Sequence, residues 1–398
     1  MEHDFIGVIL GGDVNSYAVA RAFYEEYKIR TIVIGQYPMF PTTHSKLIEG
    51  YYYKDLLQDN GLINALTEVD NIYPNKKKIL LGNTDYYVEH ILKNRKEIEN
   101  ISSNYIIPMI SYDLFKKLVN KDSFYKLCDK YNLSHPQTVV FDFKKDEIDA
   151  FNIPFEYPIF IKPSDSVIYS NYNFEGKQKG YKVENRNEFI DIICKVKNSG
   201  FNDLFLVQEY IEGDDNSMFV FTCYTNQKHK VKAITAGQIL MHDRTPELIG
   251  NYNAIKNTYN EEISLKLKEF LEKIKFNGIC HFDVQYDKKN KRYVVYEINI
   301  RQGRSNYYTL ASKTNLAKLL VEDYIYNKDS NFFIANNEFT ASIVPKRTLK
   351  KALEKNNQSF KIKNFSRFTL AKYDLNIFRI YYQDKWDKKI LRSYFKYN

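Results

Sequence analysis

The segment Cys280–Asn306, with the sequence CHFDVQYDKKNKRYVVYEINIRQGRSN, carries the strongest structural signal in the chain. Apolar and polar side chains alternate over Cys280–Tyr286, and a second alternating run covers Tyr293–Asn299. Strict alternation predicts two β-strands, and the polar stretch Asp287–Arg292 suits a turn between them. The segment therefore predicts a β-hairpin that carries charged side chains on one face.

A hairpin centred on Asn290 would set Asp283 directly opposite Glu297, with Asn299 two residues further on the same face. Two facing carboxylates repel, so the pair is stable only if one is protonated or a cation lies between them. Hard oxygen ligands of this kind suit Mg²⁺. Alternatively, both acids lie on the solvent face of an ordinary hairpin and are satisfied by neighbouring Lys or Arg.

Two arginines follow the acidic strand directly. Arg301 and Arg304 lie in the loop RQGRSN that ends the segment. A guanidinium offers bidentate hydrogen bonds to a carboxylate or a phosphate, and a metal beside it would neutralise the acids. The loop therefore favours a site for a metal and an anion over a solvated hairpin.

Length and composition indicate a globular protein of two or three domains, since 398 residues with 44% hydrophobic content can bury several cores. No stretch approaches the roughly 18–20 apolar residues of a membrane span, and Met1–Leu10 lacks the features of a signal peptide. We therefore expect a cytoplasmic protein. The cysteines at 128, 194, 223 and 280 lack metal or disulfide spacing and are predicted to be reduced and mostly buried.

Positive charge is concentrated in the C-terminal region. Residues 346–398 contain 15 Lys or Arg and 4 Asp or Glu, a net charge of +11, whereas the whole chain carries +9, so the remainder sums to about −2. Such a region can attract a nucleotide-linked substrate, an anionic membrane surface or nucleic acid. No nucleic-acid motif accompanies the charge. A solvated basic face on a small terminal subdomain, folded by its aromatic residues, is the simpler interpretation.

The chain begins with a pattern typical of a Rossmann-like βαβ unit. Phe5–Leu10 and Thr31–Gly35 have the composition of buried strands, with an amphipathic helix over Ser16–Lys28. The intervening turn GGDVNS is not the GxGxxG motif and gives little support for dinucleotide binding. Asp13, Asn15 and Ser16 are expected to cap the helix, whose amides would face an anion, although capping alone would explain these residues.

A second region, from residue 118, contains shorter signals for phosphate and nucleotide binding. A helix is predicted over Lys121–Tyr131, and the strand Pro158–Lys162 ends in a lysine ahead of Ser164 and a polar loop. An ammonium group and loop amides can cradle phosphates. After the strand Leu204–Val207 comes QEYIEGDD, where backbone groups can pair with a purine edge and a carboxylate can accept from ribose. An exposed loop and an acidic linker are the alternatives.

Four pieces occur in a set order: the strand ending at Lys162, QEYIEGDD at 208–215, FDVQ at 282–285 and EINIRQGRSN at 297–306. Together they resemble the ATP-grasp ligase superfamily, over residues 1–325. The opening LGGDVNSYAVARAFYEEY at 10–27 is similar to that of bacterial carboxylate-amine ligases, the group that includes D-aspartate ligase of peptidoglycan synthesis. The resemblance implies an α/β fold with four parts: a Rossmann-like domain at 1–117, an ATP-grasp small lobe at 118–207, a large lobe with the metal site at 208–325, and a basic aromatic extension at 326–398.

The resemblance also implies roles for matching residues. For ATP these are Lys121, Lys162 and Ser164 at the phosphates, Gln208, Glu209 and Ile211 around adenine, largely through backbone for the last two, and Asp215 at ribose. For two Mg²⁺ ions, for which Mn²⁺ can substitute, they are Asp283, Glu297 and Asn299, with Glu297 bridging. Arg301 matches the family's catalytic arginine, although Ile300 departs from the Pro that usually precedes it. The amino-acid substrate is expected to contact Asp13, Asn15, Arg304, Ser305 and Asn306.

The implied reaction is carboxylate activation followed by amide formation. The carboxylate attacks the γ-phosphate of ATP to give an acyl phosphate, with Mg²⁺, Lys162 and Arg301 stabilising the developing charge, and an amine then displaces phosphate. For the D-aspartate ligase group, the acid would be the β-carboxylate of D-aspartate and the amine a lysine side chain of a UDP-muramyl pentapeptide. The diphosphate of that acceptor would suit the basic C-terminal region. His281 is expected to be structural rather than catalytic.

Two other functions stay open. One is an ATP-grasp amino-acid or peptide ligase with different substrates, in surface-polymer or small-metabolite synthesis. The other is a non-catalytic nucleotide-binding regulator or scaffold, against which the complete set of metal ligands and Arg301 argues. No nucleic-acid partner is expected, and weak contact of the basic region with an anionic membrane is conceivable. The sequence indicates no oligomeric state.

Overall fold

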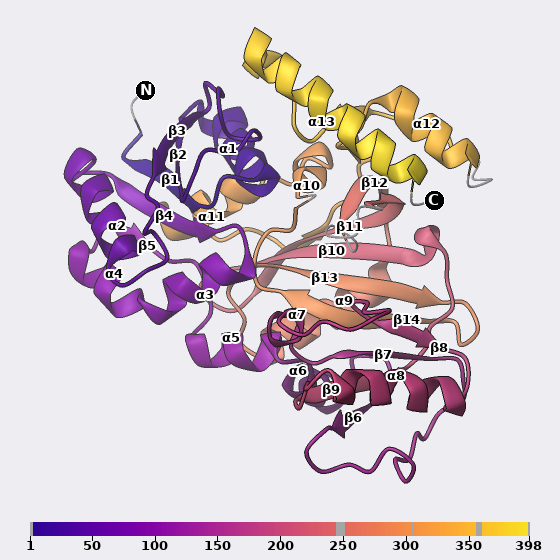
Figure 1. Ribbon diagram of the computed structural model, residues 1–398. Coiled ribbons are helices and arrows are strands. Elements are labelled where there is room, and N and C mark those ends of the chain that lie inside the picture. Colours follow the sequence, from indigo (N-terminus) through magenta and orange to yellow (C-terminus); the bar gives the residue numbers. More distant parts are fainter. Residues whose placement is uncertain (1–2, 244–250, 305, 356–359, 397–398) are drawn as a thin grey trace. The chain divides into compact units, whose positions relative to one another are not determined.

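The computed structural model describes residues 3–243, 251–304, 306–355 and 360–396 (Figure 1). The chain groups into two units. Unit 1 comprises Met1–Val119, Asp214–Val284 and Glu297–Asn398, and unit 2 comprises Asn120–Gly213 and Gln285–Tyr296. Both units combine helices with sheets, so the α/β class is confirmed. The predicted four-part division is finer than this grouping and stays a prediction.

Unit 1 begins with a parallel sheet in the order β3-β2-β1-β4-β5. Its strands are β1 (Phe5–Leu10), β2 (Thr31–Gly35), β3 (Ile48–Tyr52), β4 (Lys77–Gly82) and β5 (Tyr105–Ile106). Its helices are α1 (Val14–Tyr27), α2 (Gly61–Ile72), α3 (Asp85–Lys93) and α4 (Arg95–Ile101), followed by α5 (Tyr112–Val119). β1 and β2 are buried along their whole length, as expected of parallel strands that helices cover on both faces. The predicted βαβ opening is confirmed.

The strand order creates a reversal beside β1, which lies between β2 and β4. Parallel α/β sheets bind ligands at such a reversal, beyond the carboxyl ends of the strands. Gly11 follows β1 there and Asn83 follows β4. Gly11 has a φ of +100°, and a Cβ atom on it would lie 2.1 Å from Asn83 Oδ1. Only glycine permits both this conformation and this close approach.

The second sheet has eight strands, in the order β14-β13-β10-β11-β12-β16-β17, with β15 beside β11. Its strands are β10 (Met218–Thr225), β11 (Val231–His242), β12 (Tyr252–Thr258), β13 (Gly278–Asp287), β14 (Arg292–Asn299), β15 (Phe333–Ile334), β16 (Thr340–Ser342) and β17 (Phe365–Arg367). The short 3₁₀ helix η1 (Asp215–Ser217) precedes β10. β13 and β14 are neighbours joined by a turn at 288–291, which confirms the predicted hairpin.

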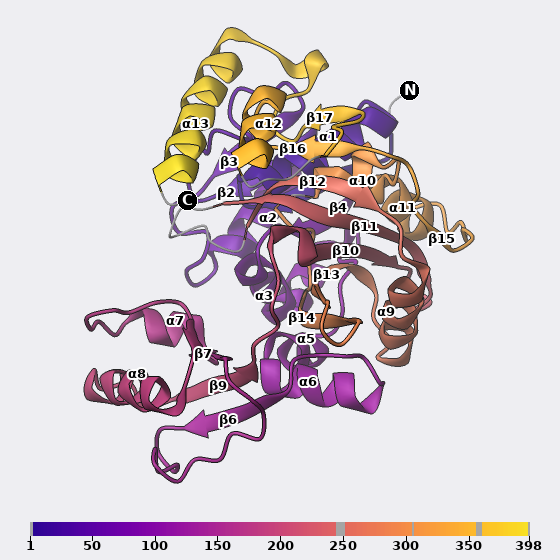
Figure 2. The ribbon, with the colours of Figure 1, turned by 90° about the vertical axis from the view of Figure 1, so that its right-hand side faces the viewer.

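Helices pack on both faces of this sheet (Figure 2). On one face, Phe270 of α9 (Glu261–Lys273) packs against Phe282 of β13, with ring centroids 6.1 Å apart. On the other face, Tyr308 of α10 (Tyr307–Ala311) donates to the hydroxyl of Thr222 at 2.7 Å. Unit 1 also contains the helices α11 (Leu316–Tyr324) and α12 (Lys346–Lys355). Side chains alternate along β13, so Phe282 directed at α9 places Asp283 on the face opposite α9.

Unit 2 contains an antiparallel sheet in the order β6-β9-β7-β8. Its elements are α6 (Lys121–Lys130), β6 (Thr138–Asp142), β7 (Ile159–Pro163), α7 (Ser166–Ser170), β8 (Tyr181–Val183), α8 (Arg186–Asn198) and β9 (Leu204–Glu209). The predicted helix and strands of this region are confirmed within one or two residues. The hairpin tip groups with this unit, where Arg292 pairs with Glu209 at 2.6 Å and with Asp287 at 3.2 Å.

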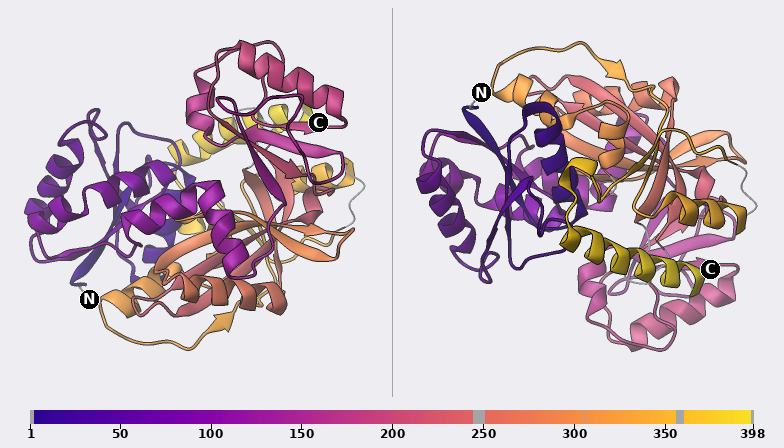
Figure 3. Two further views of the ribbon diagram at one scale, coloured as in Figure 1. Left: turned by 90° about the horizontal axis from the view of Figure 1, so that it is seen from below. Right: turned by 90° about the horizontal axis from the view of Figure 1, so that it is seen from above.

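The basic C-terminal region groups with unit 1, and its predicted status as a small terminal subdomain stays a prediction. β16 pairs with β12, and β17 pairs with β16, so the region extends the eight-stranded sheet. The 3₁₀ helix η3 (Lys372–Asp374) and the helix α13 (Ile377–Lys396) follow. α13 starts beside the segment after β2 (Figure 3), where Asn376 Nδ2 donates to the carbonyl of His44 at 2.7 Å.

None of the helices in the described part of the chain has the length and hydrophobicity that a membrane crossing requires. The four cysteines are free thiols. Cys128, Cys223 and Cys280 are buried and Cys194 is half-buried, as the sequence predicts.

Candidate active site

The predicted acidic residues of the hairpin meet in unit 1. Asp283 comes from β13, and Glu297 and Asn299 come from β14. Burial, together with the repulsion and hydrogen bonding of the nearby Glu297 carboxyl, raises the pKa of Asp283 to about 8. Asp283 accepts from Tyr252 OH at 2.5 Å and from Asn299 Nδ2 at 3.1 Å. The two carboxylates therefore form the mutually repelling pair that the sequence suggests.

This donor set fits Mg²⁺ better than it fits a solvated hairpin. In the described part of the chain, the hydrogen-bond donors to Asp283 are a phenol and an amide, not the lysine or arginine of the alternative interpretation. Two carboxylates and an amide oxygen, close together and partly shielded from water, are hard oxygen ligands whose repulsion a divalent cation would relieve. The assignment of these residues as metal ligands stays a prediction.

Arg301 lies next to the acidic pair. Its Nη2 donates to Asp85 Oδ2 at 2.9 Å and to Asn299 Oδ1 at 3.2 Å. Its Nε has no hydrogen-bond partner within the described structure. Ile300, the residue that departs from the usual Pro, is 3% exposed and packs in the core. A buried isoleucine therefore anchors the loop at the position where the family usually has proline, and the Arg301 guanidinium lies beside the acids.

Arg304 lies further along the same loop. Its Nη1 is 3.4 Å from Asp243 Oδ2, and its guanidinium carbon lies 5.9 Å from the centroid of the Trp386 ring. Ser305 lies outside the described residues. Asn306 is buried, with its side-chain amide donating to Gln302 Oε1, and is not among the residues that line the cavity described below. A substrate contact by Asn306 therefore stays a prediction from the sequence.

The start of α1 carries a polar network. Asp13 caps the helix as predicted, because its Oδ1 accepts from the amide of Asn15 at 2.9 Å. Asn83 Nδ2 donates to Asp13 at 2.6 Å and to Ser16 Oγ at 2.8 Å, and Asn15 Nδ2 donates to the carbonyl of Asn83 at 2.8 Å. Burial raises the pKa of Asp13, and the charges of Arg304 and Arg301 oppose that shift.

A cavity of about 870 Å³ in unit 1 brings these groups together. The cavity is lined by the following residues that the sequence predicts for the site: Asp13, Asn15, Asp283, Glu297, Asn299, Arg301 and Arg304. Those that the sequence did not single out for this site are Met39, Phe40, Pro41, Asn83, Thr84, Tyr382, Lys385, Trp386 and Lys389. Tyr252 and His281 also line it. The cavity is thus walled by residues from the start, the middle and the end of the chain.

Some of the site residues that were not predicted could have been recognised from their position in the sequence. Asn83, Thr84 and Asp85 directly follow a buried parallel strand, and β4 is the neighbour of β1, so their position beyond the strand ends could have marked them. Lys385 and Trp386 could not have been recognised in this way, because only the packing of α13 places them at the cavity.

His281 lies against the loop that follows β14, and its expected structural role stays a prediction. Burial and the charge of Arg301 lower the pKa of His281 to about 3, so the ring is neutral. Its Nδ1 lies 3.2 Å from the carbonyl oxygen of Arg301. A Cβ atom on Gly303 would lie 2.7 Å from the imidazole, so this glycine lets the loop pass the ring closely.

Two lysines implied for phosphate binding lie in unit 2. Lys121 opens α6, and Lys162 lies in β7 with its Nζ 5.9 Å from the ring centroids of both Phe160 and Tyr296. Ser164 follows β7, and its amide donates to the carbonyl of Leu204 at 2.9 Å. Their roles stay predictions.

The segment implied for adenine also lies in unit 2. Gln208 is buried in β9, where its Nε2 donates to Tyr125 OH at 3.1 Å and to Thr138 Oγ1 at 2.9 Å. The Glu209 carboxylate pairs with Arg292 at 2.6 Å, and its expected role through the backbone stays a prediction. The carbonyl of Ile211 accepts from Gln285 Nε2 at 3.1 Å. Asp215 lies in unit 1, where its backbone opens η1.

Comparison with known proteins starts from sequence. The chain is 35% identical over 333 residues to D-aspartate ligase from Enterococcus faecium (strain Aus0004), which covers 82% of this chain and 78% of that protein. No protein-family model matches the chain.

Solved structures resemble the whole fold at low sequence identity. N5-carboxyaminoimidazole ribonucleotide synthetase in complex with ADP has a TM-score of 0.62 at 11% identity, covering 100% of this chain and 98% of that one. The L-amino acid ligase from Bacillus licheniformis has a TM-score of 0.56 at 12% identity, covering 81% and 74%. These likenesses confirm the ATP-grasp fold. Together with the identity to the Enterococcus faecium enzyme, they show that the chain belongs to the D-aspartate ligase family of ATP-grasp carboxylate-amine ligases, which form carbon–nitrogen bonds at the expense of ATP.

Proposed function

We propose that this protein joins the β-carboxylate of D-aspartate to the lysine side-chain amine of a UDP-muramyl pentapeptide, a precursor of peptidoglycan. The observation that carries the proposal is the arrangement of one cavity in unit 1, which holds the paired acids, two arginines and the capped start of α1. The 35% identity to D-aspartate ligase of Enterococcus faecium supports the choice of substrates.

The cavity offers complementary groups for a small zwitterionic acid. Arg304 is suited to the α-carboxylate, because its contact with Asp243 is long at 3.4 Å and its guanidinium can turn to a better acceptor. Asp13 and Asn15 are suited to the ammonium group. The Asn15 Oδ1 atom is buried and lacks a hydrogen-bond partner within the described structure, so a bound ammonium would satisfy it.

ATP and Mg²⁺ are the cosubstrate and the metal of this proposal. Asp283, Glu297 and Asn299 would hold two Mg²⁺ ions, or Mn²⁺ in their place, and the metal would supply charge neutralisation at the phosphates. In unit 2, Lys121, Lys162 and Ser164 would contact the phosphates. Adenine and ribose would be bound by Gln208, Glu209 and Ile211 and by Asp215.

The chemistry proceeds in two steps. A β-carboxylate oxygen attacks the γ-phosphorus of ATP, the bond to the β,γ-bridging oxygen breaks, and ADP leaves with that electron pair. The amine nitrogen then attacks the acyl carbon, loses a proton and expels phosphate. Arg301 would stabilise the negative charge that develops in both steps, since it lies beside the acids and its Nε is unpaired within the described structure.

Replacing Arg301 with lysine is expected to lower kcat by about a hundredfold. The Nη2 of Arg301 donates to Asp85 and Asn299 while its Nη1 donates to the carbonyl of Gln302, and the single nitrogen of a lysine cannot occupy both positions. Phosphate release under saturating substrates measures the effect. The exposed Arg347→Lys on α12 is the matched control and should keep normal activity. A normal kcat for Arg301→Lys would remove this residue from the proposed chemistry.

The proposed function is tested with the purified protein, ATP, Mg²⁺, D-aspartate and UDP-muramyl pentapeptide containing lysine. We expect phosphate release that requires D-aspartate, together with a product heavier than the acceptor by one aspartyl residue. L-aspartate serves as the matched control and should not support turnover. Absence of release with D-aspartate would refute the assignment, and a screen of amino acids of both hands would then identify the acid of this ligase.

A further inference from the structure

One wall of the active-site cavity is formed by the basic C-terminal helix. Tyr382, Lys385, Trp386 and Lys389 of α13 all line the cavity that contains Asp283 and the paired Glu297. Their spacing of three, four and seven residues places them on one side of the helix. The cavity is large beside a single amino acid, since its volume of about 870 Å³ lies near the upper end of the range for drug-sized ligands. Space therefore remains next to this wall for part of a second substrate.

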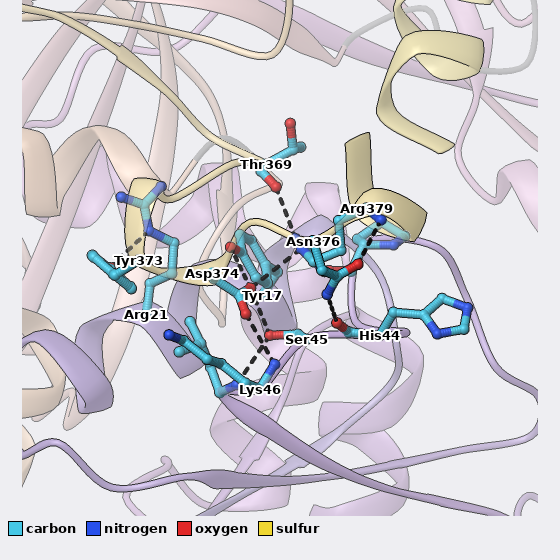
Figure 4. A network of polar contacts seen from close by, with 12 residues as sticks. Tyr17, Arg21, His44, Ser45, Lys46, Thr369, Tyr373, Asp374, Asn376 and Arg379 are labelled. Carbon is cyan, nitrogen blue, oxygen red and sulfur yellow. Dashed lines mark hydrogen bonds and ion pairs between the residues drawn. The ribbon is translucent and has the colours of Figure 1, made fainter. Parts of the chain in front are cut away.

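The wall is fixed in place by a buried polar network (Figure 4). Asp374, just before α13, accepts from Tyr17 OH at 2.8 Å, from Ser45 Oγ at 2.8 Å and from the amide of Lys46 at 2.9 Å. It also pairs with Arg379 of α13 at 3.3 Å. The side chains of Asp374 and Arg379 are 1% and 0% exposed. The start of α13 is thus tied to α1 and to the segment after β2.

Arg379 extends this connection to the cavity itself. It donates to the carbonyls of Pro41, Thr43 and Thr369 at 3.2, 3.2 and 2.9 Å. Pro41 lines the cavity together with Phe40, whose ring lies 5.7 Å from that of Trp386 in an edge-to-face arrangement. The lining residues of α13 therefore stand on a rigid support, as a binding site requires.

The lysines of this wall are available for an anion. Lys385 and Lys389 are exposed, and neither forms an ion pair with an acid in the part of the chain that the structure describes, although the ammonium of Lys385 lies 4.4 Å from the centroid of the Tyr381 ring. The two acids of the helix are engaged elsewhere: Asp384 pairs with Lys388 at 2.6 Å and Asp387 pairs with Arg367 at 2.8 Å. The positive charge that faces the cavity is therefore not neutralised from within the helix.

We infer that this side of α13 binds the amine acceptor, with Lys385 and Lys389 contacting its anionic oxygens and Trp386 and Tyr382 packing against its body. The inference rests on the proposed function, because it assigns one part of the cavity to the second substrate of that reaction. The donor amino acid has its own cations in Arg301 and Arg304, at the acidic pair and the start of α1. The anionic oxygens of the acceptor come from its diphosphate or from the carboxylates of its peptide.

The test compares Lys385→Ala/Lys389→Ala with the matched control Lys388→Ala, which removes a lysine of the same helix that does not line the cavity. For the double variant, KM for UDP-muramyl pentapeptide should rise about tenfold to a hundredfold, as expected for the loss of one or two charge-assisted contacts. Its KM values for ATP and D-aspartate should stay within about twofold of the wild type. Lys388→Ala should leave all three unchanged. An unchanged KM for the acceptor in the double variant would overturn the inference.

A second arm identifies the anion. The same pentapeptide without its nucleotide is used as acceptor: if the lysines bind the diphosphate, the double variant and the wild type should use it equally well, and if they bind peptide carboxylates, the KM difference should persist. Trp386 is the single tryptophan of the chain, so its fluorescence reports directly on this wall. Titration with UDP alone or with the free pentapeptide should shift its emission for the fragment that the lysines bind.

A half-reaction separates this inference from the proposed function. With ATP, Mg²⁺, D-aspartate and hydroxylamine, the acyl phosphate is trapped as a hydroxamate without any peptide acceptor. Hydroxamate formation by the double variant at the wild-type rate, together with a raised KM for the acceptor, is the expected pair of results. If the wild type forms no hydroxamate, D-aspartate is not the donor. If the wild type forms hydroxamate normally but does not use the pentapeptide as acceptor, both the proposed acceptor and the proposed role of α13 are wrong.

Discussion

Glu297→Gln should lower turnover by about a thousandfold or more, because it removes a charged oxygen from the centre of the proposed metal site. The substitution keeps the shape of the side chain. It also ends the repulsion between Glu297 and Asp283, which raises the pKa of Asp283 in the wild type. We therefore expect the thermal stability of the variant, measured with a chelator present, to equal or exceed that of the wild type. Phosphate release and a thermal melt provide the two measurements.

The matched control is Glu262→Gln, which changes an acid on α9 whose side chain is 75% exposed and pairs with Lys266. It should retain full activity, since an exposed ion pair contributes about 1 kcal/mol at most. The two variants differ in their response to Mg²⁺, as only Glu297→Gln should require a higher concentration for its residual rate. Wild-type turnover by Glu297→Gln would show that this carboxylate binds no catalytic metal.

Asp374→Ala is expected to lower the stability of unit 1 by about 3–5 kcal/mol, the usual cost of removing one partner from a buried ion pair. It leaves Arg379 with a fully buried charge, and it leaves Tyr17 and Ser45 without their acceptor. Urea unfolding followed by circular dichroism should show a lower midpoint. Because the same network supports the cavity wall, the remaining folded protein should also bind the acceptor more weakly.

The double variant Asp374→Asn/Arg379→Met is compared with Asp374→Ala. Removing both charges avoids the unpaired guanidinium, so it should recover part of the lost stability. Asp384→Ala removes an acid from an exposed pair on α13 and should change the stability by less than about 1 kcal/mol. A midpoint for Asp374→Ala that matches Asp384→Ala would mean that the network contributes nothing beyond a surface contact.

Contact of α13 with an anionic membrane stays a prediction from the sequence. The helix exposes Ile377, Phe378, Ile380 and Tyr381 among its lysines and arginines, which is compatible with such a contact but also with a free surface.

Local elements and the family could be predicted from the order and spacing of residues. The alternation over Cys280–Asn299 fixed a hairpin, because the side-chain period of a strand is two and needs no distant partner. The turn after β1 predicted the cap at Asp13 for the same reason, since capping joins residues two or three apart. The ordered motifs around Lys162 and Arg301 indicated an ATP-grasp ligase, and the 35% identity to D-aspartate ligase agrees with them.

The set of groups that share the active-site cavity depends on how distant elements pack together. Asp85 reaches Arg301 across 216 positions of sequence, and Tyr252 reaches Asp283 from a different strand. The position of the basic C-terminal region depends on Asp374 and Arg379, which bind Ser45 and Pro41. These contacts place Lys385 and Lys389 of α13 at the cavity. Contacts of this range leave no periodic pattern in the sequence, because they depend on how whole elements pack and not on the spacing of neighbouring residues.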